Sequence, residues 1–105
     1  MAYAFTQDVP IPWPVYEQIR RELGEAAPPG LIAHVVIDTG NGLRYLDVWE
    51  SKEQCMEFMS GRIHPILGRI LARAGIPRPE REPAQDRIEV REVWAPRQLL
   101  GGQVR

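Results

Sequence analysis

The stretch HVVIDTGNGLRYLDVWES, residues 34–51, decides the fold because two apolar runs flank a glycine-rich turn. Asn41 and Gly42 are favoured in tight hairpin turns because both residues tolerate positive φ. The sequence therefore predicts two antiparallel strands, 31–38 and 43–50. A two-residue turn would pair His34 with Trp49, and a four-residue turn would pair His34 with Asp47. Either register places these three side chains on one face of the hairpin.

The segments around the hairpin predict two helices and two further strands. The run at 2–9 has the short aromatic and apolar content of a strand, and the prolines that follow it are typical of a helix entry. Apolar residues then recur at helical spacing over 13–24. The run at 87–94 alternates apolar and charged residues, which predicts a last strand.

A long amphipathic helix is expected after the hairpin. Ser51 and Gln54 form a capping-box pattern, and apolar residues recur every three or four positions as far as Gly75. Pro65 lacks a backbone donor and crowds the carbonyl of Gly61, so we expect the helix to bend or break between these two residues.

The order of these elements is strand, helix, strand, strand, helix, strand. This order predicts an α+β fold of the ferredoxin-like type, with a four-stranded antiparallel sheet and two helices on one face. A chain of 105 residues has room for one such domain, spanning 1–105.

Alternation along the hairpin strands predicts which side chains share a face. One face is expected to be aliphatic and to carry Leu31, Ala33, Val35, Ile37, Leu46 and Val48. The opposite face is expected to carry Ile32, His34, Val36, Tyr45, Asp47 and Trp49. An exposed aliphatic patch of this size favours cover by a second copy of the chain, which predicts a homodimer.

Composition narrows the partners and the compartment. Thirteen basic and fourteen acidic residues give a net charge of −1, and no window has the Lys and Arg clustering typical of nucleic-acid binding. No apolar run approaches the roughly 20 residues of a membrane span. A single cysteine, Cys55, and no recognisable signal peptide favour the cytoplasm. We therefore expect neither nucleic acid nor a membrane as a partner.

The run GLIAHVVIDTGNGLRYLDVWESKEQCMEFMSGRIHPIL, residues 30–67, resembles the dimeric α+β barrel proteins related to the antibiotic biosynthesis monooxygenases, especially their actinobacterial-type members. The resemblance implies two sheets facing each other in a homodimer, with a ligand cavity between each sheet and its own helices. Such proteins include cofactor-independent monooxygenases of polycyclic aromatic compounds, haem-degrading enzymes, cyclases, isomerases and proteins without known activity. The strand-one asparagine of the haem-degrading relatives is missing from 3–8.

The candidate site is the polar part of the hairpin. Asp47 beside His34 would fix the imidazole tautomer and make it a better general base, so these two residues are the predicted catalytic pair. Tyr45, Trp49 and His64 are the predicted substrate-binding residues. No spacing typical of a metal site joins the histidines to Asp47, so no metal is expected.

Three functions follow from this site. The first is an enzyme of secondary metabolism, such as a cofactor-independent monooxygenase or a cyclase, that acts on a small aromatic or polyketide-like substrate without a cofactor. The second is a dimeric protein of ligand binding or stress response that binds an apolar or aromatic ligand without turnover. The third, kept at the margin, is haem binding through His64.

Overall fold

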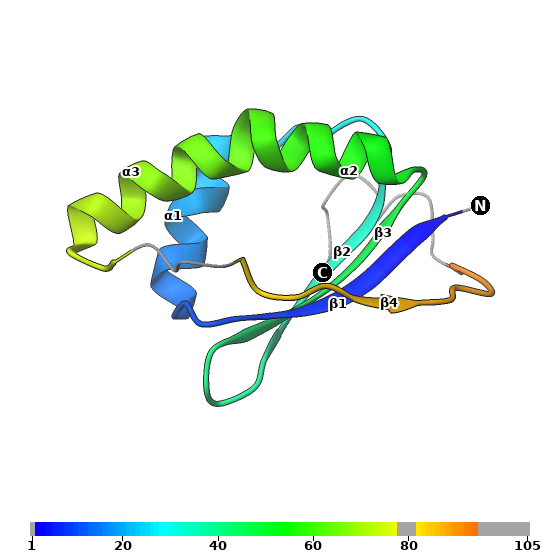
Figure 1. Ribbon diagram of the computed structural model, residues 1–105, viewed down its shortest axis with the longest axis horizontal. Coiled ribbons are helices and arrows are strands. Elements are labelled where there is room, and N and C mark those ends of the chain that lie inside the picture. The colour runs from blue at the N-terminus through cyan, green and yellow to red at the C-terminus, as the bar shows by residue number, and fades with distance from the viewer. Residues whose placement is uncertain (1, 78–81, 95–105) are drawn as a thin grey trace.

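The computed structural model describes residues 2–77 and 82–94 and has an α+β architecture. The elements follow the predicted order (Figure 1): β1 (Tyr3–Val9), α1 (Trp13–Leu23), β2 (Leu31–Asp38), β3 (Leu43–Trp49), α2 (Lys52–Phe58), a π-helical turn η1 (Met59–Ile63), α3 (His64–Ala74) and β4 (Asp86–Ile88). None of the helices in the described part of the chain is both long and apolar enough to span a membrane.

The four strands form one antiparallel sheet in the order β2-β3-β1-β4. This order is compatible with a ferredoxin-like fold. Both helical segments, α1 and the continuous α2-η1-α3, lie on the same side of the sheet (Figure 1). The other side of the sheet is not covered by any helix among the described residues.

The hairpin adopts the longer of its two predicted turns. Asp38 pairs with Leu43 and His34 pairs with Asp47, so four residues form the loop. Gly40 and Gly42 take the positive φ angles, at 87° and 127°, whereas Asn41, like every other non-glycine residue that the structure describes, has a negative φ. The expectation that Asn41 uses a positive φ is therefore wrong, and the loop is closed by Thr39, whose backbone N–H donates to the carbonyl of Gly42.

A β-bulge at the start of β2 corrects one predicted face. Leu31 pairs with Trp49 and Ala33 pairs with Val48, which leaves Ile32 as an extra residue opposite no partner. The bulge shifts the alternation by one residue, and Leu31 packs against the core cluster on the helix side of the sheet. We call the face of the sheet that is turned away from the helices the open face. The prediction that Leu31 lies with the other aliphatic residues on this face is therefore wrong.

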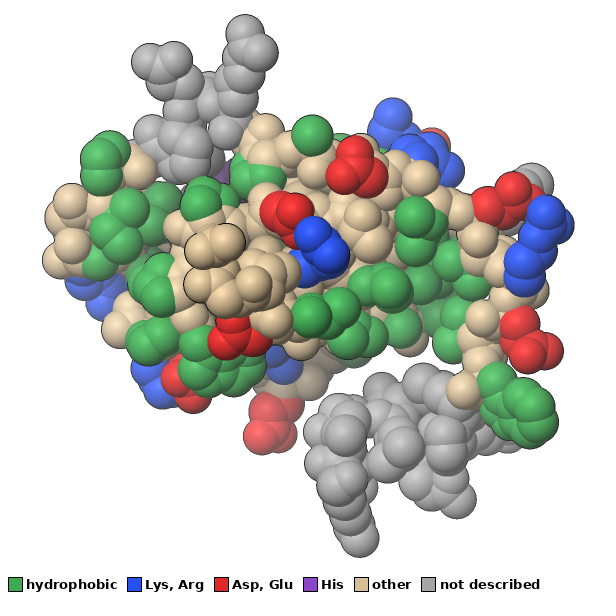
Figure 2. Space-filling model, turned by 90° about the horizontal axis from the view of Figure 1, so that it is seen from below, with side chains coloured by type: hydrophobic (Ala, Val, Ile, Leu, Met, Phe, Trp, Pro, Cys, Tyr) green, Lys and Arg blue, Asp and Glu red, His purple; other side chains and the backbone are tan. Residues whose placement is uncertain are grey.

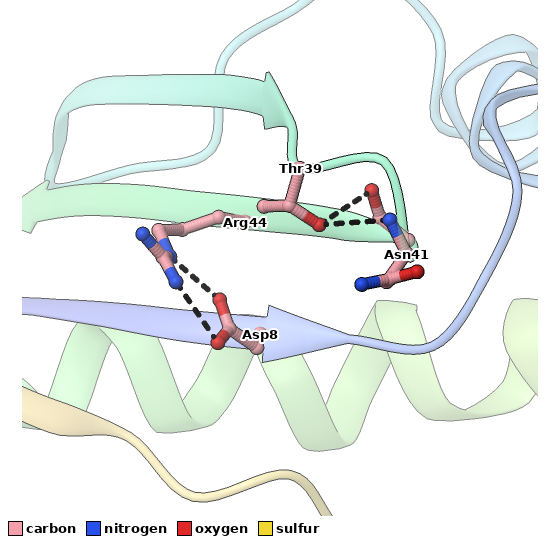
Figure 3. A network of polar contacts seen from close by, with 5 residues as sticks. Asp8, Thr39, Asn41 and Arg44 are labelled. Carbon is pink, nitrogen blue, oxygen red and sulfur yellow. Dashed lines mark hydrogen bonds and ion pairs between the residues drawn. The ribbon is translucent and has the colours of Figure 1, made fainter.

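The open face is apolar at its β2 side and charged near the hairpin loop. Val35 and Ile37 are 46% and 43% exposed, and hydrophobic side chains are spread over this side of the molecule among charged ones (Figure 2). Arg44 of β3 makes two hydrogen bonds, of 2.7 and 3.2 Å, to the carboxylate of its strand partner Asp8 (Figure 3). Val48, by contrast, is already buried within the chain.

The helices begin and end as the sequence predicts. Pro14 occupies the first turn of α1, and Gly24 follows its last residue. Ser51 caps α2 by accepting a hydrogen bond from the backbone N–H of Gln54, at 3.2 Å. The capping box is not reciprocal, because the side chain of Gln54 accepts from the Ser51 hydroxyl and not from its backbone N–H.

The long helix is irregular just before Pro65, as the sequence predicts. The backbone switches to π-helical hydrogen bonding in η1, and the N–H of His64 donates to the carbonyl of Met59 five residues back. The wider turn accommodates a proline that supplies no donor for the carbonyl of Gly61. The chain does not break, so the predicted irregularity takes the form of a π turn within a continuous helix.

Two hydrophobic clusters hold the helices to the sheet and to each other. The first joins the ends of β1 and β3 to α2 and consists of Tyr3, Phe5, Trp49 and Cys55. The second joins α1 to α3 and consists of Val15, Ile19, Ile66 and Ile70.

The last strand is shorter than predicted. β4 spans only Asp86–Ile88, and residues 89–94 have no strand pairing. Trp94, at the end of the segment predicted as a strand, is 90% exposed. The apolar and charged alternation of this segment therefore predicts a strand only at its beginning.

Candidate functional site

The predicted pair, His34 and Asp47, lies at the centre of the hairpin on the helix side of the sheet. The two residues are direct partners across β2 and β3, and Nδ1 of His34 is 2.6 Å from Oδ1 of Asp47. The Asp47 side chain is buried and the His34 side chain is 25% exposed. A buried carboxylate requires polar partners, and the imidazole supplies one of them.

Trp49 supplies the second partner of the carboxylate. Its indole N–H donates to Oδ2 of Asp47 at 3.1 Å, from two residues further along the same strand and the same face. Trp49 is only 1% exposed, and its ring packs against Phe58 of α2 with the centroids 5.6 Å apart. Each oxygen of Asp47 therefore has its own donor, one toward the site and one in the core.

A residue of the first helix completes the arrangement. The hydroxyl of Tyr16, on α1, lies 2.9 Å from Nε2 of His34. Because the carboxylate of Asp47 can only accept, it selects the tautomer with hydrogen on Nδ1, and Nε2 then accepts the hydrogen bond from Tyr16. Both ring nitrogens of His34 are thus engaged.

The hydroxyl of Tyr16 is held in its neutral form. Burial is the main cause that raises its pKa above the ordinary value, and the charge of Asp47 adds to the effect, while Arg20 partly opposes it. The phenol is protonated at neutral pH, as an ordinary tyrosine is, and its raised pKa makes it a weaker acid, so it can donate a hydrogen bond to His34 without ionising.

Aromatic rings surround the imidazole. Tyr45 lies edge-on to His34 with the centroids 5.0 Å apart, and Tyr16 is tilted against Tyr45 at 5.7 Å. Trp13, at the start of α1, stacks on Tyr16 at 5.2 Å and is exposed to solvent. Burial raises the pKa of Tyr45 strongly, with smaller contributions from Tyr16 and Asp47, so this wall is neutral as well. Trp13 is the point at which the cluster meets water.

We call Tyr16, His34, Asp47 and Trp49 the polar row, because hydrogen bonds connect them in that order from α1 to the core. Its chemistry is that of an imidazole whose carboxylate partner stabilises a positive charge. Such an imidazole accepts a proton at Nε2 from Tyr16, or through Tyr16 from a molecule bound beside it. The row is suited to acid-base chemistry.

The remaining predicted residue, His64, lies in a different environment. Its Nε2 is in contact with Oε1 of Glu82 without the alignment of a hydrogen bond. It lines a pocket of about 390 Å³ together with Met56, Met59, Ser60, Glu82, Pro83 and Gln85. Among the described residues, no hydrogen bond or ring contact joins His64 to the polar row. The structure therefore brings together four of the five predicted site residues and leaves His64 apart.

Other candidate sites are less developed. A second surface pocket of about 400 Å³ lies between α1 and α3 and is lined by Gln18, Arg21, Glu22, Ile70, Arg73 and Ala74. Within residues 2–77 and 82–94, no three His, Cys, Asp or Glu side chains are grouped closely enough to hold a metal ion. Neither of the two pockets includes His34.

Sequence reasoning missed Tyr16 and Trp13. Tyr16 lies in the apolar stripe that helical spacing predicts over 13–24, and it is buried. The available signal was its hydroxyl, because a buried tyrosine needs a polar partner and His34 lies on the helix side of the sheet.

Comparison of the chain with family models, curated proteins and solved structures finds no match. The resemblance to the antibiotic biosynthesis monooxygenases therefore stays an expectation from the sequence. What the fold and the site define is an α+β protein in which a largely buried polar row ends at an aromatic cluster that meets solvent at Trp13.

Proposed function

We propose that this protein is a small-molecule enzyme in which His34, polarised by Asp47, removes a proton from an acidic C–H or O–H bond of an aromatic or polyketide-like substrate. One observation carries the proposal: the hydrogen-bonded row of Asp47, His34 and Tyr16 ends at Tyr16, which stacks on the solvent-exposed ring of Trp13. A carboxylate-imidazole-hydroxyl sequence is one arrangement that supports general acid-base catalysis. Monooxygenation and cyclisation, the reactions implied by the resemblance, can both begin with removal of such a proton.

Tyr16 takes part in the proton transfer because its hydroxyl occupies Nε2 of His34. The phenol passes its proton to the imidazole as it receives one from the substrate, and Asp47 stabilises the imidazolium that forms. Tyr45 and Trp13 supply flat faces against which an aromatic substrate stacks. No cofactor has a part in this proposal.

The test is exchange of the acidic hydrogens of a probe with deuterated water. Anthrone and 2-tetralone carry acidic C–H bonds beside a carbonyl, and proton NMR measures how fast these hydrogens are replaced. The protein should accelerate the exchange, and His34→Ala should reduce the acceleration by roughly 10²- to 10⁴-fold. His64→Ala is the matched control, because it removes the other histidine and leaves the polar row intact.

A loss of less than about threefold in His34→Ala would contradict the proposed role of His34. So would an equal loss in His64→Ala, since the effect would then not depend on the polar row.

A dimeric binding protein without turnover is the second candidate. The observation that favours it is that both ring nitrogens of His34 already have partners inside the chain, at 2.6 and 2.9 Å. A fully satisfied imidazole has a structural role in many proteins. Saturable binding of the probes with exchange no faster than in buffer would favour this function over the enzyme.

For either function we propose that the open sheet face is covered by a second copy of the chain, as in the dimeric barrels that the sequence resembles. The support is the exposure of Val35 and Ile37 on a face that no described helix covers. An interface of standard size, about 1,600 Å² in total, is expected for such a contact.

A further inference from the structure

The geometry points to Trp49 as a positioning residue, whose indole N–H holds the Asp47 carboxylate in the orientation that engages His34. This inference rests on the proposed function, because it concerns how the same polar row is kept ready for proton transfer. It also gives Trp49 a role other than the predicted one of contacting substrate.

The two oxygens of the Asp47 carboxylate have different donors. Oδ1 of Asp47 faces His34 across the hairpin at 2.6 Å, and Oδ2 faces the indole nitrogen of Trp49 at 3.1 Å. Rotating the carboxylate away from either donor would leave a buried polar group unpaired, which costs free energy in an environment without water. The two donors therefore fix the plane of the carboxylate together.

Trp49 is itself held in place by core packing. Its side chain is almost fully buried in the cluster with Tyr3, Phe5 and Cys55, and the ring of Phe58 packs against it at 5.6 Å. A dense core holds such a ring in one rotamer. The indole N–H is thus a rigid donor supplied by the core.

Hydrogen bonds connect the core to the site through Asp47 and His34. The clamped indole orients Asp47, Asp47 fixes the tautomer of His34, and His34 aligns the hydroxyl of Tyr16 on the neighbouring helix. Supporting hydrogen bonds of this kind determine whether a catalytic group is held in a productive orientation.

The experiment measures the hydrogen on Nδ1 of His34, which needs no substrate. In the wild-type chain this hydrogen should give a distinct downfield proton signal in NMR that exchanges slowly with water. In Trp49→Phe the exchange should become at least about tenfold faster, the factor that corresponds to a hydrogen bond of about 1.4 kcal/mol. Phenylalanine keeps one aromatic ring, but it removes the N–H and also leaves a cavity where the second ring of the buried indole was, so the packing change needs its own controls.

Two control variants separate positioning from packing. Phe58→Leu loosens the ring contact of Trp49 but keeps its N–H, and it should leave the Nδ1 signal in place even where it lowers stability. Trp94→Phe makes the same chemical change at an exposed position. If Trp49→Phe does not fold, benzothienylalanine incorporated at position 49 keeps the fused ring without the N–H and should give the same faster exchange.

The outcomes are distinguishable. An exchange rate in Trp49→Phe equal to that in Trp94→Phe would overturn the positioning role, as would an equally faster exchange in Phe58→Leu. The Nδ1 hydrogen could exchange faster in Trp49→Phe as predicted while the wild-type chain does not accelerate deuterium exchange of the probes. This combination would support the positioning role of Trp49 and contradict the proposed enzyme.

Discussion

Asp47→Asn is the change that acts most directly on the polar row. The amide has nearly the volume of the carboxylate, but it replaces one acceptor oxygen with an NH₂ donor. Asp47 accepts from His34 and from Trp49, so the amide oxygen can serve only one of them. If it serves the clamped indole, its NH₂ group faces Nδ1 of His34. The imidazole must then move its hydrogen to Nε2, where it opposes the hydroxyl proton of Tyr16.

The size of the effect follows from these two bonds. A hydrogen bond to a charged group contributes about 1.5–3 kcal/mol, and one between neutral groups contributes about 0.5–1.5 kcal/mol. One charged bond becomes neutral and the other must be rearranged, while the cost of burying a charge disappears. We expect Asp47→Asn to lower the free energy of unfolding by about 1–3 kcal/mol, and to reduce probe exchange by roughly the 10²- to 10⁴-fold typical of acid-base catalysis.

Urea unfolding at one fixed protein concentration measures the stability, because an oligomer would make it concentration-dependent. A double-mutant cycle with His34→Ala should give a coupling energy of at least about 1 kcal/mol between the two side chains. Asp8→Asn is the matched control, since it makes the same change on an exposed carboxylate of β1. The reasoning fails if Asp47→Asn stays within about 0.5 kcal/mol of the wild type and the coupling energy is zero.

Three further predictions concern the fold around the site. Gly30→Ala should lower the free energy of unfolding in urea by about 1 kcal/mol more than Gly40→Ala does. The two glycines have similar φ angles, 88° and 87°, so the backbone strain is alike. At Gly30, however, a Cβ would lie 2.4 Å from Cδ of Gln54, whereas at Gly40 it would meet no atom within 4 Å. Burial raises the pKa of the Cys55 thiol from its ordinary value of 9.0 to about 11, so the folded chain keeps a proton that the unfolded chain has lost. The free energy of unfolding should therefore fall as the pH rises from about 9 to about 11. Cys55→Ala should make this dependence on pH less steep. Val35→Glu should convert the proposed dimer to a monomer in sedimentation, whereas a wild-type chain that sediments as a folded monomer at micromolar concentration would contradict the dimer.

Local pattern was sufficient to predict the hairpin and the face that carries the site. Strict alternation along two strands keeps His34, Asp47 and Trp49 together in either register, so the site did not depend on the exact turn. The glycine-rich loop, the Ser51 cap and the irregular turn before Pro65 also follow from chemistry within a few residues. Each of these is a short-range property that the sequence contains.

Two predictions from the sequence that were wrong concern the face of Leu31 and the length of the last strand. Both depend on contacts that the neighbouring residues in the sequence do not indicate. The bulge that moves Leu31 to the helix side is a response to pairing across the sheet, and GLIAHVV has no glycine or proline at the bulged position. The alternation at 87–94 similarly does not indicate where pairing with β1 stops. Both depend on how separate segments fit together.

Tyr16 illustrates the same limit for the site. Its helical spacing predicts that it is buried, but which strand residue its hydroxyl meets depends on how α1 packs on the sheet. Contacts between segments far apart in sequence are decided by tertiary packing and not by periodicity. The role of Trp49 as a partner of Asp47 likewise becomes visible only when both rotamers are known.

The central claim is that Asp47 holds His34 as a proton acceptor facing Tyr16. Long-range proton-nitrogen correlation in a histidine-labelled sample measures which ring nitrogen carries the hydrogen, with His64 as an internal reference in the same spectrum. The structure predicts that neutral His34 is a single tautomer with hydrogen on Nδ1 and with an unprotonated Nε2 that accepts from the hydroxyl of Tyr16. Hydrogen on Nε2, or a mixture of tautomers for His34, would contradict the claim.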